Sequence, residues 1–165
     1  MVRLSRVNAP DAPNAARDAT TSGVRGVLEG LRIVVVDDDP DARDLLATVL
    51  TQRSAQVFVA DGAGAAFELI GRERPDVLIS DIAMPEEDGY MLIRRVRALA
   101  ADEGGRTPAF AVTAYAGGAD RRRALDAGFD GHFAKPVDVD ALVDMLLDVR
   151  AARDLRLARD VPTAP

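Results

Sequence analysis

Cysteine is absent from the sequence, so disulfide bonds, thiolate metal sites and cysteine nucleophiles are all excluded. Long apolar runs are also lacking: the N-terminal segment has no apolar stretch of signal-peptide length, and no later run is long enough for a membrane span. Basic residues are in deficit, with 21 Lys and Arg against 27 Asp and Glu, whereas binding to nucleic-acid phosphates needs clustered positive charge. These absences predict a cytoplasmic protein that binds neither a membrane nor nucleic acid directly.

The chain has 165 residues, 48% of them hydrophobic, which is enough for one substantial core but short for two independent domains. Residues 1–23 are rich in Ala, Asp, Asn, Pro, Thr and Ser and show no apolar periodicity. We therefore expect a flexible N-terminal leader over residues 1–30 and a single domain over residues 31–150. Residues 151–165 are expected to form a C-terminal tail, either separate or continuing the last helix.

Short apolar runs of strand length alternate with segments whose apolar residues recur at helical spacing. The predicted strands cover residues 33–36, 56–60, 77–80, 109–113 and 131–134, and most are apolar throughout, as strands covered on both faces must be. Asp39 followed by Pro40 predicts the start of the first helix, and the fifth helix should begin near Asp138. The alternation predicts an α/β domain: a doubly wound, five-stranded parallel sheet in the flavodoxin-like order 2-1-3-4-5, with helices on both faces.

Polar side chains fall at the carboxyl ends of the predicted strands, where a crevice and helix N-termini meet in such sheets. Residues 37–39 are all aspartate and follow the first strand, whereas Asp81 follows the third, Thr113 ends the fourth and Lys135 follows the fifth. Converging carboxylates repel one another unless a cation joins them, and Mg²⁺ with oxygen ligands suits such a cluster. The group is suited to phosphoryl transfer, with Asp81 as the nucleophile because it stands alone at its strand end.

Four stretches at these positions resemble the receiver domains of response regulators. Their sequences look closer to the receivers of hybrid histidine kinases than to those of DNA-binding regulators. They are VVVDDDPDAR at 34–43, DVLISDIAMPEEDGY at 76–90, AVTAYA at 111–116 and AKP at 134–136. The resemblance covers essentially all of residues 31–150, and the four stretches in this order are far more specific than any one alone. It implies a phosphoacceptor in a two-component phosphorelay rather than an enzyme with turnover.

The resemblance also implies a role for each residue of the site. Asp37 and Asp38 would be the acidic pair that holds Mg²⁺, Asp81 would be phosphorylated and would also bind the metal, and the carbonyl of Ala83 would complete the coordination. Thr113 would be the switch hydroxyl, Lys135 would contact the phosphoryl group, and the peptide bond between Lys135 and Pro136 would be cis. His132 stands where the family often has a ring that changes rotamer on phosphorylation.

The phosphodonor implied is a sensor histidine kinase or a histidine phosphotransfer protein. Phosphorylation is expected to shift the conformation of the surface around the fourth helix, the fifth strand and the fifth helix, and this shift would change the affinity for a partner. A second copy of the chain, in a dimer that forms on phosphorylation, is one such partner. Ala83 and Tyr115 follow Asp81 and Thr113 by two residues each. Alanine cannot orient a hydrolytic water and a tyrosine ring is large enough to exclude one, so we expect slow self-dephosphorylation.

Other interpretations of the same residues stay open from the sequence. Residues 37–39 taken alone could be no more than a polar cap, and the arginines at 121–123 a solvated helix face or part of a partner surface. A Mg²⁺-dependent phosphohydrolase with an aspartyl-phosphate intermediate would use the same nucleophile, but it normally carries an acid at the position of Ala83. A receiver-like interaction module that is never phosphorylated is the third interpretation, although every expected site residue is present.

Overall fold

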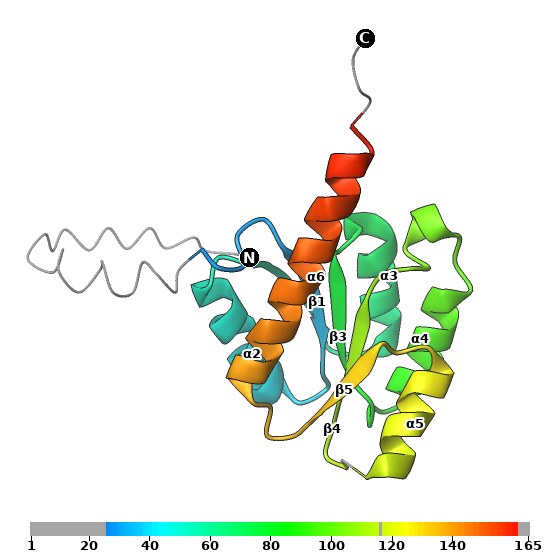
Figure 1. The fold of residues 1–165 in the computed structure, drawn as a ribbon. Helices are drawn as coiled ribbons and strands as arrows, with labels where there is room; N and C mark the ends of the chain where they lie inside the picture. Colours follow the sequence, from blue (N-terminus) through cyan, green and yellow to red (C-terminus); the bar gives the residue numbers. More distant parts are fainter. Residues whose placement is uncertain (1–25, 116, 162–165) are drawn as a thin grey trace, which may run out of the picture.

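The computed structural model of the chain describes residues 26–115 and 117–161. Its centre is one parallel sheet of five strands in the order β2-β1-β3-β4-β5, as predicted (Figure 1). The strands are β1 (Arg32–Val36), β2 (Gln56–Ala60), β3 (Val77–Asp81), β4 (Ala109–Thr113) and β5 (Gly131–Ala134). Their bounds differ from the predicted ranges by one residue at two places, the start of β1 and the end of β3.

Five α-helices alternate with the strands, and a short 3₁₀ helix, η2 (Ala101–Glu103), precedes β4. They are α2 (Pro40–Gln52), α3 (Ala63–Glu73), α4 (Gly89–Arg97), α5 (Gly118–Ala127) and α6 (Val139–Arg159). Aspartates cap three of them: the side chains of Asp39, Asp88 and Asp138 each accept a hydrogen bond from a backbone N–H of the first helical turn. The expected starts of the first and fifth helices are therefore confirmed.

Two apolar cores cover the two faces of the sheet because successive strand residues point to opposite sides. In β1, Ile33 and Val35 pack with residues of α2 and α6, while Val34 and Val36 pack with residues of α3, α4 and α5. Figure 1 shows α2 and α6 on one side of the sheet and α3, α4 and α5 on the other. The expected arrangement of helices on both faces is confirmed, and it fixes the strand ends that carry the polar residues.

The turn at residues 26–30 and helix α6 meet at the amino-terminal edge of the sheet. Residues 26–30 form a turn in which the Leu28 side chain is fully buried. Arg150 donates a hydrogen bond to the Val27 carbonyl at 2.6 Å. Arg153 donates one to the Gly30 carbonyl at 2.7 Å and one to the Asp76 carboxylate at 3.0 Å. We call Arg150, Arg153 and these three acceptors the terminal clasp.

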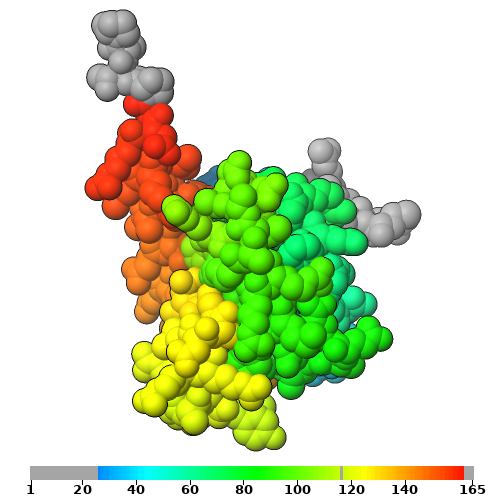
Figure 2. All heavy atoms as spheres, turned by 90° about the vertical axis from the view of Figure 1, so that its right-hand side faces the viewer, coloured from blue at the N-terminus to red at the C-terminus, as the bar shows by residue number. Residues whose placement is uncertain are grey.

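Helix α6 runs on past this clasp to Arg159, so residues 151–159 of the expected tail are helical. Figure 2 shows the last turns of α6 standing clear of the rest of the domain, where Leu155 and Leu157 are exposed. The expected leader falls mostly on residues 1–25, and the last residues of the tail on 162–165, all of which lie outside the described residues. No helix within the described ranges is both long and apolar enough to cross a membrane.

Candidate functional site

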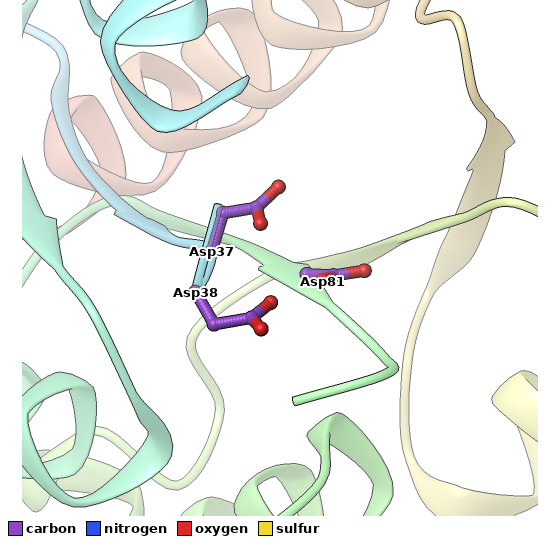
Figure 3. A group of neighbouring side chains, drawn as sticks. All are labelled: Asp37, Asp38 and Asp81. Carbon is purple, nitrogen blue, oxygen red and sulfur yellow. The ribbon is translucent and has the colours of Figure 1, made fainter. Parts of the chain in front are cut away.

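Three carboxylates come together at the carboxyl ends of β1 and β3. Asp37 and Asp38 follow β1 directly, and Asp81 is the last residue of β3. The two strands are paired in register, with Val36 opposite Ser80, so the residues that follow are neighbours. One carboxylate oxygen from each aspartate lies within 4.8 Å of the others. Figure 3 shows the three side chains turned to the same side of the strand ends.

Lys135 joins two of these carboxylates from the loop that follows β5. Its ammonium nitrogen lies 3.0 Å from Oδ2 of Asp37 and 3.3 Å from Oδ1 of Asp81. The lysine is placed by its backbone N–H, which donates to the Thr113 carbonyl at 2.8 Å, and its peptide bond to Pro136 is cis as the resemblance implied. The fold therefore brings a cation from position 135 to two carboxylates that lie far from it in the chain, at positions 37 and 81.

Burial and mutual repulsion make Asp81 harder to ionise than an ordinary aspartate. Its side chain is only 7% exposed. Loss of water and the nearby charge of Asp37 raise the pKa of Asp81 from 3.8 to about 6, although the ammonium of Lys135 partly opposes them. Burial lowers the pKa of Lys135, but its hydrogen bond to Asp37 and the charge of Asp81 outweigh burial and raise it. The lysine therefore stays charged, but its single positive charge does not balance the three carboxylates of the cluster.

The donor set fits a hard divalent cation. Oδ1 of Asp37 accepts from the Asp39 N–H and Oδ2 from Lys135, while Oδ1 of Asp81 accepts from the Ile82 N–H. Within residues 26–115 and 117–161, Oδ2 of Asp81 and both oxygens of Asp38 accept no hydrogen bond and are open to a ligand. An exposed carboxylate beside two buried ones offers oxygen ligands on one side and room for waters on the other, an arrangement that Mg²⁺ favours.

A cavity of about 300 Å³ opens above these carboxylates, and Ala83, Thr113 and Tyr115 lie on its wall. Thr113 ends β4 half-buried, and its hydroxyl oxygen accepts a hydrogen bond from the Tyr115 N–H at 3.1 Å. Ala83 lies on the loop after β3 and is exposed. The Tyr115 ring is 73% exposed, so it lies open at the rim instead of covering the site. His132, half-buried in β5, is not part of the cavity wall.

Sequence reasoning missed four residues of this site. Tyr90, Asp120 and Arg123 line the cavity, although the arginine had been placed in a charge run with no link to the aspartates. A side chain on Gly89 would collide with the backbone oxygen of Asp81, so this position must be glycine for α4 to start so close to β3. The spacing of Asp120 and Arg123, three residues apart on one helix face just after Thr113, was the available signal.

Comparison with known proteins agrees with this geometry. A sequence profile of the response regulator receiver domain matches residues 33–147. An uncharacterised 14.6 kDa protein of Leptolyngbya boryana is 51% identical over 111 residues, which are 67% of this chain and 83% of that protein. The sensor histidine kinase RcsC of Salmonella typhi is 35% identical over 127 residues, 77% of this chain, but the match spans only 13% of the kinase.

A solved receiver-domain structure is similar to this chain in fold and sequence. The receiver domain of the sensor histidine kinase PA1611 of Pseudomonas aeruginosa, solved with a magnesium ion coordinated in its active-site cleft, is 30% identical. It superimposes with a TM-score of 0.66, covering 72% of this chain and 96% of that domain. Fold, acidic cluster and sequence profile agree, and this chain belongs to the response regulator receiver family, the phosphoacceptor domains of two-component signalling.

Proposed function

We propose that Asp81 accepts a phosphoryl group from a phosphohistidine, with Mg²⁺ held by Asp37, Asp38, Asp81 and the carbonyl of Ala83. The observation that carries the proposal is the joint placement of three carboxylates and the Lys135 ammonium at the ends of β1, β3 and β5. In a phosphoryl-transfer site the metal supplies positive charge to the oxygens of the transferred group. The proposal also includes a cytoplasmic location, because a chain without cysteine fits a reducing compartment.

The protein residues act on the phosphoryl group through charge and hydrogen bonding. Asp81 would attack through Oδ2, which accepts no hydrogen bond within the described residues, while Oδ1 stays on the Ile82 N–H. The same carboxylate would also help to hold Mg²⁺. Lys135 already lies 3.3 Å from Asp81, and it needs only a small movement to pair with the phosphoryl oxygens instead. Thr113 turns its hydroxyl from the Tyr115 N–H towards the same oxygens, which moves the start of the segment leading to α5.

The phosphodonor of this proposal is a sensor histidine kinase or a histidine phosphotransfer protein. A second cavity of about 230 Å³, almost entirely apolar, lies between α2 and the loop before α6 and is lined in part by Asp37 and Lys135. Leu45 on its wall is 65% exposed. Because a donor histidine must reach Asp81 while its protein is held nearby, this apolar groove beside the site is where we place the donor.

Labelling with acetyl phosphate tests the central step. Wild-type protein should take up one acid-labile phosphoryl group in the presence of Mg²⁺, and Asp81→Asn should take up none because an amide oxygen is a poor nucleophile. Excess chelator should also prevent labelling of the wild type. Equal labelling of Asp81→Asn, or full labelling in chelator, would show that the nucleophile or the metal assignment is wrong.

The donor surface has its own test. Leu45→Asp places a charge in the apolar groove without touching the carboxylates, so it should slow transfer from a phosphorylated donor protein while leaving labelling by acetyl phosphate unchanged. Thr48→Asp, on the same helix but outside that groove, is the matched control. Equal effects of the two substitutions would remove the groove from the proposal and leave the chemistry of Asp81 intact.

A further inference from the structure

Two basic side chains line the cavity above Asp81, and only one of them is already engaged. Lys135 is bound to the carboxylates of Asp37 and Asp81. Arg123, in contrast, makes no hydrogen bond or ion pair with any residue that the structure describes. It is the cation of this cavity whose donors are free to meet an incoming anion.

The guanidinium of Arg123 is nevertheless held in place. Its central carbon lies 4.4 Å from the centre of the Tyr90 ring, and that ring is only 7% exposed. Tyr90 is itself fixed because Gly89 packs against the backbone of Asp81 at the start of α4. On the side of α5, the buried neighbour Ala124 sets the rotation of the helix. Stacking uses the face of the guanidinium and leaves the N–H groups at its edge for an acceptor.

The wall of the cavity carries mostly negative charge, which opposes the entry of an anionic phosphodonor. Five aspartates line the wall, at positions 37, 38, 39, 81 and 120, and they repel any phosphodonor, which is itself an anion. Arg123 is exposed and therefore lies at the mouth, on the path by which a donor enters. A cation at this point lowers the repulsion where the donor is still outside the carboxylate cluster.

We propose that Arg123 determines which small phosphodonors the site accepts, by binding the anionic leaving group at the mouth of the cavity. The inference rests on the proposed phosphorylation of Asp81 and deepens it. In transfer from acetyl phosphate, the bond from phosphorus to the Asp81 oxygen forms while the bond from phosphorus to the acetyl oxygen breaks. The bonding electron pair departs with acetate, so negative charge grows on the side of phosphorus away from Asp81, inside a cavity whose wall includes Arg123.

A donor with a nitrogen leaving group releases a neutral molecule instead of an anion. In phosphoramidate the leaving nitrogen is protonated and departs as ammonia, so no negative charge develops at the mouth of the cavity. A guanidinium there stabilises the departure of acetate but gives no such help to ammonia. Arg123 therefore raises the preference for acyl phosphates over phosphoramidates.

The test compares the two donors on wild type, Arg123→Ala and Arg123→Lys at fixed Mg²⁺ and ionic strength. For acetyl phosphate we expect Arg123→Ala to lower kcat/KM for self-phosphorylation by about three- to fivefold, the scale of one partly exposed charge interaction, and Arg123→Lys to restore most of it. Phosphoramidate gains from the lowered repulsion on entry but releases no anion, so Arg123→Ala should lower its rate by less than about twofold. Arg122→Ala is the matched control, because Arg122 is exposed on the same helix but does not line the cavity.

The outcomes separate the inference from the function on which it rests. An equal loss with both donors, or an equal loss in Arg122→Ala, would overturn the role of Arg123 while labelling of Asp81 stands. A wild type that neither donor labels would overturn both. Arg123→Gln removes the charge but keeps a longer, polar side chain than alanine, and it carries the same comparison if the alanine variant folds poorly.

Discussion

Replacing Asp81 by asparagine should stabilise the metal-free protein, although it removes the proposed phosphoacceptor. The pKa of Asp81 is raised to about 6 in the folded chain, so the ionised carboxylate is held there at a cost that the unfolded chain does not bear. A raised pKa adds stability only while the group is protonated, and that stability is lost as the pH rises from the ordinary value of 3.8 through about 6. Asparagine copies the protonated form at every pH.

The size of the effect follows from the pKa. One pKa unit corresponds to about 1.4 kcal/mol, so the rise from 3.8 to about 6 makes Asp81→Asn more stable by about 3 kcal/mol near pH 7.5. At about pH 5 most of the folded wild type is protonated on Asp81, and the advantage should shrink by about half. The loss of the contact with Lys135 is already contained in these values, because that ammonium is among the causes of the pKa.

Urea unfolding in chelator provides the assay, with the free energy of unfolding measured for both proteins at the two pH values. The two chains differ at position 81 alone, so the pH dependence of the difference reports the carboxylate of Asp81 together with the neighbours that its charge affects. Mg²⁺ added near neutral pH should then stabilise the wild type and leave Asp81→Asn nearly unchanged, because ligand binding to the folded state adds stability.

Asp38→Asn is the matched control, since Asp38 is the exposed member of the same cluster and water screens its charge. Its gain in stability should be much smaller than that of Asp81→Asn. If Asp81→Asn is equal to or less stable than the wild type in chelator, or if its advantage does not depend on pH, the electrostatic account of the cluster is wrong.

Three further outcomes are expected. Asp38→Ala should weaken Mg²⁺ binding, measured by calorimetry, and slow labelling by acetyl phosphate, because it removes the carboxylate that is most open to the metal; unchanged binding would contradict this. Gly89→Ala should lower the free energy of unfolding in urea by about 1–3 kcal/mol, because its methyl group meets the Asp81 carbonyl oxygen. Ala83→Asn and Tyr115→Glu should each speed phosphate release from the phosphorylated chain, since each places a polar group where it can orient water; if neither does, the lifetime is set elsewhere.

The strands and the acidic cluster were accessible from sequence because both depend on short-range patterns. Apolar runs such as 33–36 and 77–80 identify strands that are covered on both faces, and the carboxyl ends of parallel strands necessarily meet at one edge. Once the strand order is given, Asp37 and Asp81 must be neighbours. The caps at Asp39 and Asp138 follow from local hydrogen bonding alone.

Contacts that depend on helix rotation or on distant segments were not accessible. Arg123 was indistinguishable from Arg122 in a charge run, because only the packing of α5 against Tyr90 decides which arginine faces the cavity. Leu28 lay within a segment expected to be a flexible leader, yet it is fully buried. Two adjacent apolar residues, Val27 and Leu28, carry no periodic signal, and Leu28 is buried in a core cluster that includes residues of α2 and α6.

The terminal clasp has a mechanical consequence. Arg153 binds the Gly30 carbonyl before β1 and the Asp76 carboxylate before β3, so the turn at 26–30 and α6 are tied together at the edge of the sheet opposite the carboxylate cluster. Tension applied between the turn at 26–30 and the projecting end of α6 would run through these guanidinium contacts. The force would then act on these contacts and not on the strands. The carboxylates at the far ends of the strands would keep their spacing while the turn and the helix are pulled apart.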